Sequence, residues 1–115
     1  MTYLLRNLST GVVVASRVGY AKGFFSRLVG LLGKSSMDQD DGLWIPGCDS
    51  VHMMCMRVEL DIVFLDAEGV VLKVVNRAKR NRPFFGCRGS KVVVELAIGS
   101  GSGISVGDRL ELSRS

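Results

Sequence analysis

The sequence lacks any long apolar run. No stretch approaches the roughly 20 consecutive apolar residues that a membrane-spanning helix requires, although 47% of the 115 residues are hydrophobic. The N-terminal segment MTYLLRNLSTG has neither the apolar core nor the small-residue cleavage site of a signal peptide. Length and apolar content predict one well-packed domain over residues 1–115, which we expect to be cytoplasmic.

Cysteine and histidine are scarce, with three cysteines and one histidine in the chain. Cys48, Cys55 and Cys87 have neither the spacing of a small disulfide scaffold nor a Cys-x-x-Cys pair. With His52 they could complete a zinc shell. A strand at residues 51–56, however, would place His52 and Cys55 on opposite faces. We therefore predict free, mostly buried thiols, no metal site and no cofactor.

Acidic residues are missing between Gly69 and Val94, a segment that contains seven of the 15 basic residues. Such a segment is either a solvated loop or a surface for phosphates or an acidic partner. Phe84 and Phe85 lie within it and could stack on bases. Anion or nucleic-acid binding through residues 77–91 is therefore one open hypothesis, and its candidate residues are Arg77, Arg80, Arg82 and Arg88.

Helical periodicity is confined to KGFFSRLVGLLGKSS, which predicts one short α-helix at about residues 23–33. The remaining segments are short, rich in β-branched residues and separated by glycine-rich or polar turns. Residues 3–6 and 12–15 predict one hairpin, and LDIVFLD with VVLKVV predicts another around the turn DAEG. The pattern predicts a mainly β domain, either a compact sandwich or a partly closed barrel of short strands.

Two further segments have a predicted place in this fold. VHMMCMRVELDIVF is interpreted as its central strand pair, because two apolar runs are joined by a short polar link. IGSGSG lacks the spacing of a phosphate-binding loop and does not open a helix, so we interpret it as a flexible surface turn.

Two carboxylates interrupt apolar strands. Asp61 lies between two apolar residues in LDIVF, and Glu95 does so in VVELA. On a buried face each must be paired or must accept hydrogen bonds, and Arg27 and Arg57 are candidate partners. Two carboxyls that flank a bond could hydrolyse a glycoside. A small hydrolase that uses Asp61 and Glu95 is therefore an alternative function.

A second version of the hydrolase would use a Cys–His pair. Cys48 or Cys87 would be the nucleophile, with His52 as the base and Asp61 as the group that orients it. No strained turn or helix N-terminus in the sequence would activate either thiol. The sequence alone therefore favours a domain without enzymatic activity.

The segments SRLVGLLGKSS, DDGLWIPGCDSVHMMCMRVELDIVFLDAEGVVLKVV, VVVELAIGS and GISVGDRLEL together resemble the DUF192 family, also called UPF0127. The resemblance covers about residues 17–112. It implies a compact, mainly β domain without an established enzymatic activity. The recurrent residues of the family fall on Arg27, Gly30, Leu31, His52, Met56, Asp61, Phe64, Asp66, Gly69, Glu95, Leu96, Gly99, Gly107 and Asp108.

The resemblance also suggests a function. Some bacterial or archaeal members accompany secretion or pilus machinery, so we expect a non-enzymatic domain that binds a small ligand or a protein partner. Its candidate binding residues are Arg27, His52, Asp61 and Glu95. The chain departs from the family at Glu59, where proline is frequent, and at Cys55, where a small residue is frequent.

Overall fold

The computed structural model describes residues 2–21, 38–47, 50–52, 59–78 and 84–114. The helix predicted at residues 23–33 lies outside this part of the chain. The described residues form no helix, and therefore none that could cross a membrane. Their strands are β1 (Tyr3–Asn7), β2 (Val12–Tyr20), β3 (Asp41–Pro46), β4 (Ser50–His52), β5 (Leu60–Leu65), β6 (Val71–Ala78), β7 (Phe84–Gly86), β8 (Val92–Ala97) and β9 (Leu110–Arg114).

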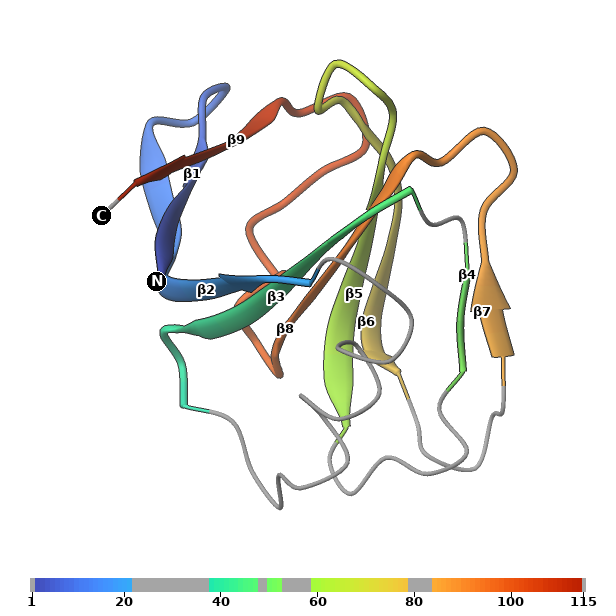
Figure 1. Cartoon of the computed structure of the whole chain (residues 1–115), viewed down its shortest axis with the longest axis horizontal. Coiled ribbons are helices and arrows are strands. Elements are labelled where there is room, and N and C mark those ends of the chain that lie inside the picture. Colours follow the sequence, from blue (N-terminus) through green and yellow to red (C-terminus); the bar gives the residue numbers. More distant parts are fainter. Residues whose placement is uncertain (1, 22–37, 48–49, 53–58, 79–83, 115) are drawn as a thin grey trace.

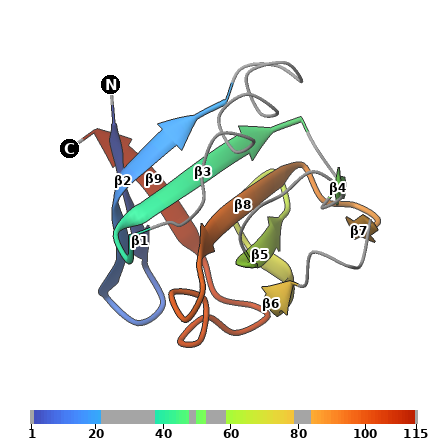
Figure 2. The ribbon, with the colours of Figure 1, turned by 90° about the horizontal axis from the view of Figure 1, so that it is seen from below.

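Seven strands form one sheet in the order β6-β5-β8-β3-β2-β1-β9, and β4 pairs with β7 in a separate ribbon. The large sheet curls into a half-barrel, with β9 and β6 at its two edges (Figures 1 and 2). All named pairs in it are antiparallel except β2 with β3. The mainly β fold is therefore confirmed, and of the two predicted architectures the partly closed barrel is the one observed.

Both predicted hairpins are present, as β1–β2 and β5–β6. The prediction of a central strand pair within VHMMCMRVELDIVF is wrong. β4 pairs with β7, whereas β5 lies between β6 and β8. All six residues of β5 are buried, and such a strand needs neighbours on both edges to satisfy its backbone.

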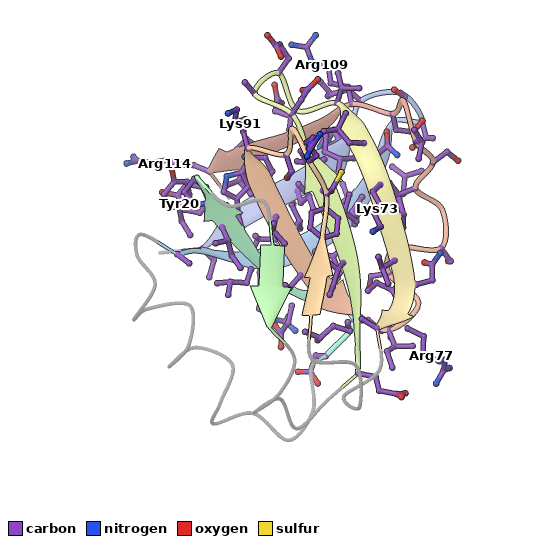
Figure 3. The ribbon with its side chains drawn as sticks, turned by 90° about the vertical axis from the view of Figure 1, so that its right-hand side faces the viewer. Tyr20, Lys73, Arg77, Lys91, Arg109 and Arg114 are labelled. Atoms are coloured by element: carbon purple, nitrogen blue, oxygen red, sulfur yellow. The ribbon has the colours of Figure 1, made fainter. Side chains whose placement is uncertain are left out.

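The sheet separates two apolar clusters. The cluster on the concave face joins both ends of the sheet, with Leu5 and Leu110 packed in the same group as Val63 and Val94. The cluster on the convex face contains Phe64 and its neighbours on the central strands. The β4–β7 ribbon lies over this convex side (Figure 3), where the Lys73 ammonium donates a 2.9 Å hydrogen bond to the Gly86 carbonyl.

A few backbone hydrogen bonds join the beginning of β6 to the beginning of β9 and so close a short part of the half-barrel. Leu110 N–H donates to the Gly69 carbonyl at 2.9 Å, and Val71 N–H donates to the Asp108 carbonyl at 2.8 Å. Gly69 has φ +84°, and a Cβ there would lie 2.6 Å from the Leu110 oxygen, so this contact requires glycine. The Asn7 side-chain amide donates to the Asp108 carboxylate at 2.9 Å and lowers the pKa of Asp108.

Candidate functional site

The Asp61 carboxylate is buried and binds backbone, with only 1% of the residue exposed. Its Oδ1 accepts a hydrogen bond from Arg77 N–H at 2.8 Å. Its Oδ2 accepts from Gly99 N–H at 2.9 Å and from Gly101 N–H at 2.8 Å. One carboxylate therefore ties the end of β6 to the loop that follows β8, which is a structural role sufficient to explain its burial.

Strand β6 has an irregularity opposite Asp61. Leu60 pairs with Ala78 and Ile62 with Val75, so two residues of β6 oppose Asp61, which is a β-bulge. The bulged residue Arg77 has φ 54° and is the one described non-glycine residue with a positive φ. Its N–H reaches the carboxylate because the bulge turns it away from the strand ladder.

The predicted flexible turn IGSGSG has a defined place beneath Asp61. Gly101 is buried, and a Cβ there would lie 3.0 Å from Asp61 Cβ and 3.1 Å from Oδ2. A residue without a side chain suits position 101 because the loop backbone approaches the carboxylate closely there. The sequence contains both an acid in an apolar strand and a glycine-rich loop. It does not show that the loop contacts this acid.

Glu95 is also buried, at 3% exposed, but on the other face of the sheet. Cross-strand neighbours point to the same face. Glu95 is paired with Ile62 of the convex cluster, whereas Asp61 is paired with Leu96 of the concave cluster. The sheet itself separates the two carboxylates. They cannot flank one scissile bond, so the geometry gives no support to a hydrolase that uses this pair.

The other candidate residues are only partly described. Arg27, Arg80, Arg82 and Cys48 lie outside the described residues. His52 ends β4 and is paired with Phe84, and its side chain is outside the described part. Cys87 is half-buried, packs on the convex cluster, and its Sγ lies 3.7 Å from the Arg88 carbonyl. The described residues hold no group of His, Cys, Asp or Glu that could bind a metal ion.

The described basic side chains are dispersed. Arg77 pairs with Glu59 at 3.2 Å, and Arg88 is exposed. Figure 3 shows Lys73, Arg77, Lys91, Arg109 and Arg114 at separate places around the molecule. Among the residues that the structure describes, these cations form no continuous surface for a nucleic-acid strand.

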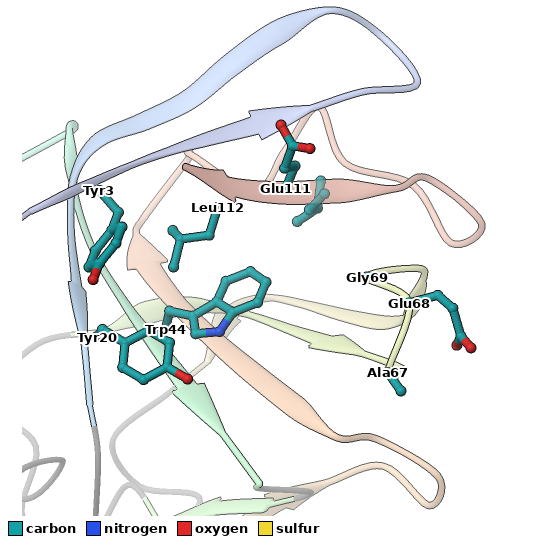
Figure 4. A pocket seen from close by; sticks show the side chains of 9 residues that line it. Tyr3, Tyr20, Trp44, Ala67, Glu68, Gly69, Glu111 and Leu112 are labelled. Carbon is teal, nitrogen blue, oxygen red and sulfur yellow. The ribbon is translucent and has the colours of Figure 1, made fainter. Parts of the chain in front are cut away.

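A pocket of about 390 Å³ opens at the other end of β5, between β9, the ends of β2 and β3, and the turn that joins β5 to β6 (Figure 4). Strand alternation places Tyr3, Tyr20 and Trp44 on the concave side of the sheet. The two tyrosine rings contact each other, with centroids 6.1 Å apart and a tilt of 50°. The complete lining is Tyr3, Tyr20, Trp44, Ala67, Glu68, Gly69, Leu110, Glu111 and Leu112.

The pocket has apolar walls with a few polar groups that can reach a ligand. Leu112 points toward Trp44, whereas the carboxylates of Glu68 and Glu111 point away from the cavity (Figure 4). The hydroxyls of Tyr3 and Tyr20 and the indole N–H of Trp44 form no hydrogen bond within the described residues. Apolar and aromatic walls with a few polar groups are typical of small-molecule sites.

The sequence analysis missed this pocket. Its aromatic residues stand at positions 3, 20 and 44, each in a different strand, and they form no motif. Their convergence depends on the parallel pairing of Tyr20 with Trp44 and on the position of β1 beside β2. The β1–β2 hairpin was predicted, but the parallel pairing of β2 with β3 cannot be read from local periodicity.

Two solved structures share this fold. A protein of unknown function from Novosphingobium aromaticivorans has a TM-score of 0.79 and 20% identity, over 95% of this chain and 82% of that chain. A protein from Sinorhizobium meliloti described as a "putative transcription regulator" has a TM-score of 0.81 and 25% identity, over 96% of this chain and 91% of that chain. No curated protein matches the sequence.

A family profile also matches. The profile of DUF192, described as "Uncharacterized ACR, COG1430", covers residues 6–112, which is nearly the whole sequence. The chain belongs to the DUF192 family.

Proposed function

We propose that this chain is a non-enzymatic binding domain that takes an aromatic or long aliphatic group of its ligand into the pocket walled by Tyr3, Tyr20 and Trp44. The observation that carries the proposal is the pocket itself, whose lining includes aromatic rings and donors that form no hydrogen bond within the described residues. Tyr and Trp suit such a site because an apolar ring carries a polar end.

The other candidate sites receive less support. The carboxylate of Asp61 already accepts backbone hydrogen bonds at both oxygens. Binding through Arg27, His52 and Glu95 remains a prediction. The description of the Sinorhizobium protein names a role in transcription. Such a role would need a basic surface for nucleic acid, and the cations that the structure describes are too dispersed to support one. A component of secretion or pilus machinery is one source of the ligand group, a proposal that rests on the resemblance and not on the pocket.

Intrinsic fluorescence tests the proposal directly, because Trp44 is the one tryptophan of the chain. A set of small aromatic and aliphatic compounds is titrated against the protein, and those that change the Trp44 emission are kept. The Tyr20→Ala change should weaken their binding about tenfold, since it removes one wall of the pocket. Val106→Ala is the control, because Val106 is exposed at 67% and does not line the pocket.

Two results would contradict the proposal. One is a compound set that leaves the Trp44 emission unchanged at millimolar concentration. The other is equal affinity of the hits for the wild-type protein and for Tyr20→Ala.

A further inference from the structure

We infer that the ligand is an extended peptide, which adds as a strand to the outer edge of β9 and inserts one side chain into the aromatic pocket. This inference rests on the proposed function, because it identifies the chemical class of ligand for that pocket. It is carried by the hydrogen-bonding direction of β9, by the position of the pocket beside it, and by the positive charge of Arg114 at its open end.

The direction of the β9 backbone follows from two hydrogen bonds. Leu8 N–H donates to the Arg109 carbonyl at 2.8 Å, which makes Leu110 and its β1 partner Asn7 a pair without mutual hydrogen bonds. The N–H of Leu110 accordingly points away from β1, to the Gly69 carbonyl at 2.9 Å. Because this direction alternates along a strand, the N–H and C=O groups of Leu112 and Arg114 also point outward.

These outward groups lack a partner in the described part of the chain. β9 is the last strand of the sheet, and the segment Gly69–Val71 covers its outer edge only as far as Leu110. Beyond Leu110 the chain of Gly69 turns back into β5, whereas β9 continues to Arg114. An incoming strand would therefore continue an antiparallel ladder that the chain itself has begun.

The pocket lies where a side chain of that strand would fall. A peptide residue opposite Leu112 exchanges two hydrogen bonds with it, and cross-strand neighbours point to the same face. Leu112 points into the pocket, toward Trp44 (Figure 4). The residue that is held most firmly by the backbone of β9 is therefore also the residue whose side chain enters the pocket, which selects an aromatic or long aliphatic residue there.

The open end of this edge is positive. Arg114 is exposed there, whereas the end near Leu110 carries both Glu68 and Arg109, whose Nε donates to the Glu68 carbonyl at 3.1 Å. An antiparallel peptide begins beside Arg114, so an acidic residue should precede the inserted side chain. The peptide must end after that side chain, because Gly69 already occupies the edge at Leu110. The sequence acetyl-Asp-Val-Phe-amide meets these requirements, with Phe opposite Leu112 and Asp opposite Arg114.

The test titrates this peptide against the full chain with Trp44 emission as the readout. N-methylation of the Phe nitrogen removes the N–H that would bond the Leu112 carbonyl, and it should weaken binding at least tenfold. N-methylation of the preceding Val is the matched control, because that N–H would point away from β9. It should change the affinity less than threefold, and replacement of Asp by Lys should weaken binding a few-fold because Lys would face Arg114.

The outcomes separate this inference from the proposed function. Equal weakening by the two methyl groups, or no effect of either, overturns strand addition. Failure of every peptide while small aromatic compounds bind the pocket also overturns the inference and leaves the proposed function standing. Failure of both ligand classes removes the two together. Sedimentation shows whether the protein is a dimer, and hydrogen exchange shows whether the β9 amides are protected in it. A dimer with protected β9 amides assigns the edge to a second copy, and the inference is then wrong.

Discussion

The polar groups at the two ends of strand β5 differ in whether the protein itself supplies their hydrogen-bond partners. At its beginning, the Asp61 carboxylate is buried and accepts three backbone N–H groups. Beyond its end, the Trp44 indole, two tyrosine hydroxyls and the edge of β9 past Leu110 have no hydrogen-bond partner within the described residues. Buried polar groups must be satisfied by the protein. Groups at an accessible surface can instead be satisfied by a ligand, so we assign stability to the first end and binding to the second.

Removal of the Asp61 carboxylate should produce the largest effect. Asp61→Ala leaves three backbone donors without their acceptor, and we expect the free energy of unfolding to fall by about 3–5 kcal/mol. Urea denaturation measures the change. Asp40→Ala, at an exposed acid, is the control and should stay within about 0.5 kcal/mol of the wild type. A loss below about 1 kcal/mol for Asp61→Ala would remove the structural role of this residue.

The glycine-rich loop offers a sharper comparison with a smaller effect. Gly101→Ala should reduce the free energy of unfolding by about 1–3 kcal/mol, because the added methyl group crowds the Asp61 side chain. Gly103→Ala is the matched control, since a Cβ there meets no atom within 4 Å. Thermal unfolding of the two variants should differ by several degrees. Equal melting temperatures would mean that the loop does not need to approach Asp61 closely.

The smallest change in stability is expected at the open end. Tyr20→Phe removes a hydroxyl that forms no hydrogen bond within the described residues, so the free energy of unfolding should stay within about 0.5 kcal/mol of the wild type. A ligand that uses this hydroxyl should bind severalfold more weakly to the variant. A loss of stability above about 1 kcal/mol would show that the pocket also holds the fold together, and the contrast between the two ends would fail.

The sequence predicted those parts of the fold that depend on local patterns. Alternation and turn residues predicted the β1–β2 and β5–β6 hairpins, because a hairpin is decided by residues close together in the chain. They could not predict that β8 pairs with both β3 and β5, because that arrangement joins segments from three parts of the sequence. The central pairing expected for VHMMCMRVELDIVF failed for this reason.

In the candidate site, too, local patterns were predicted from the sequence and contacts between distant segments were not. Asp61 was noticed because an acid in an apolar strand needs a partner, but its partners are backbone groups of Arg77, Gly99 and Gly101, which no side-chain pattern announces. The pocket residues were not noticed, because aromatic residues in strands are typical of any β core. Only the curl of the sheet brings Tyr3, Tyr20 and Trp44 to one opening.

The pairing of β1 with β9 has a consequence for synthesis of the protein. Tyr3 pairs with Arg114, and the Asn7 amide bonds to Asp108 over a separation of 101 residues. While the chain is still on the ribosome, the edge of β1 that β9 will cover stays unpaired until the last strand emerges. Contacts of such separation slow folding, and an unpaired edge invites association with other chains. The half-barrel can therefore close only after β9 has emerged, and until then the open edge of β1 is exposed to other chains.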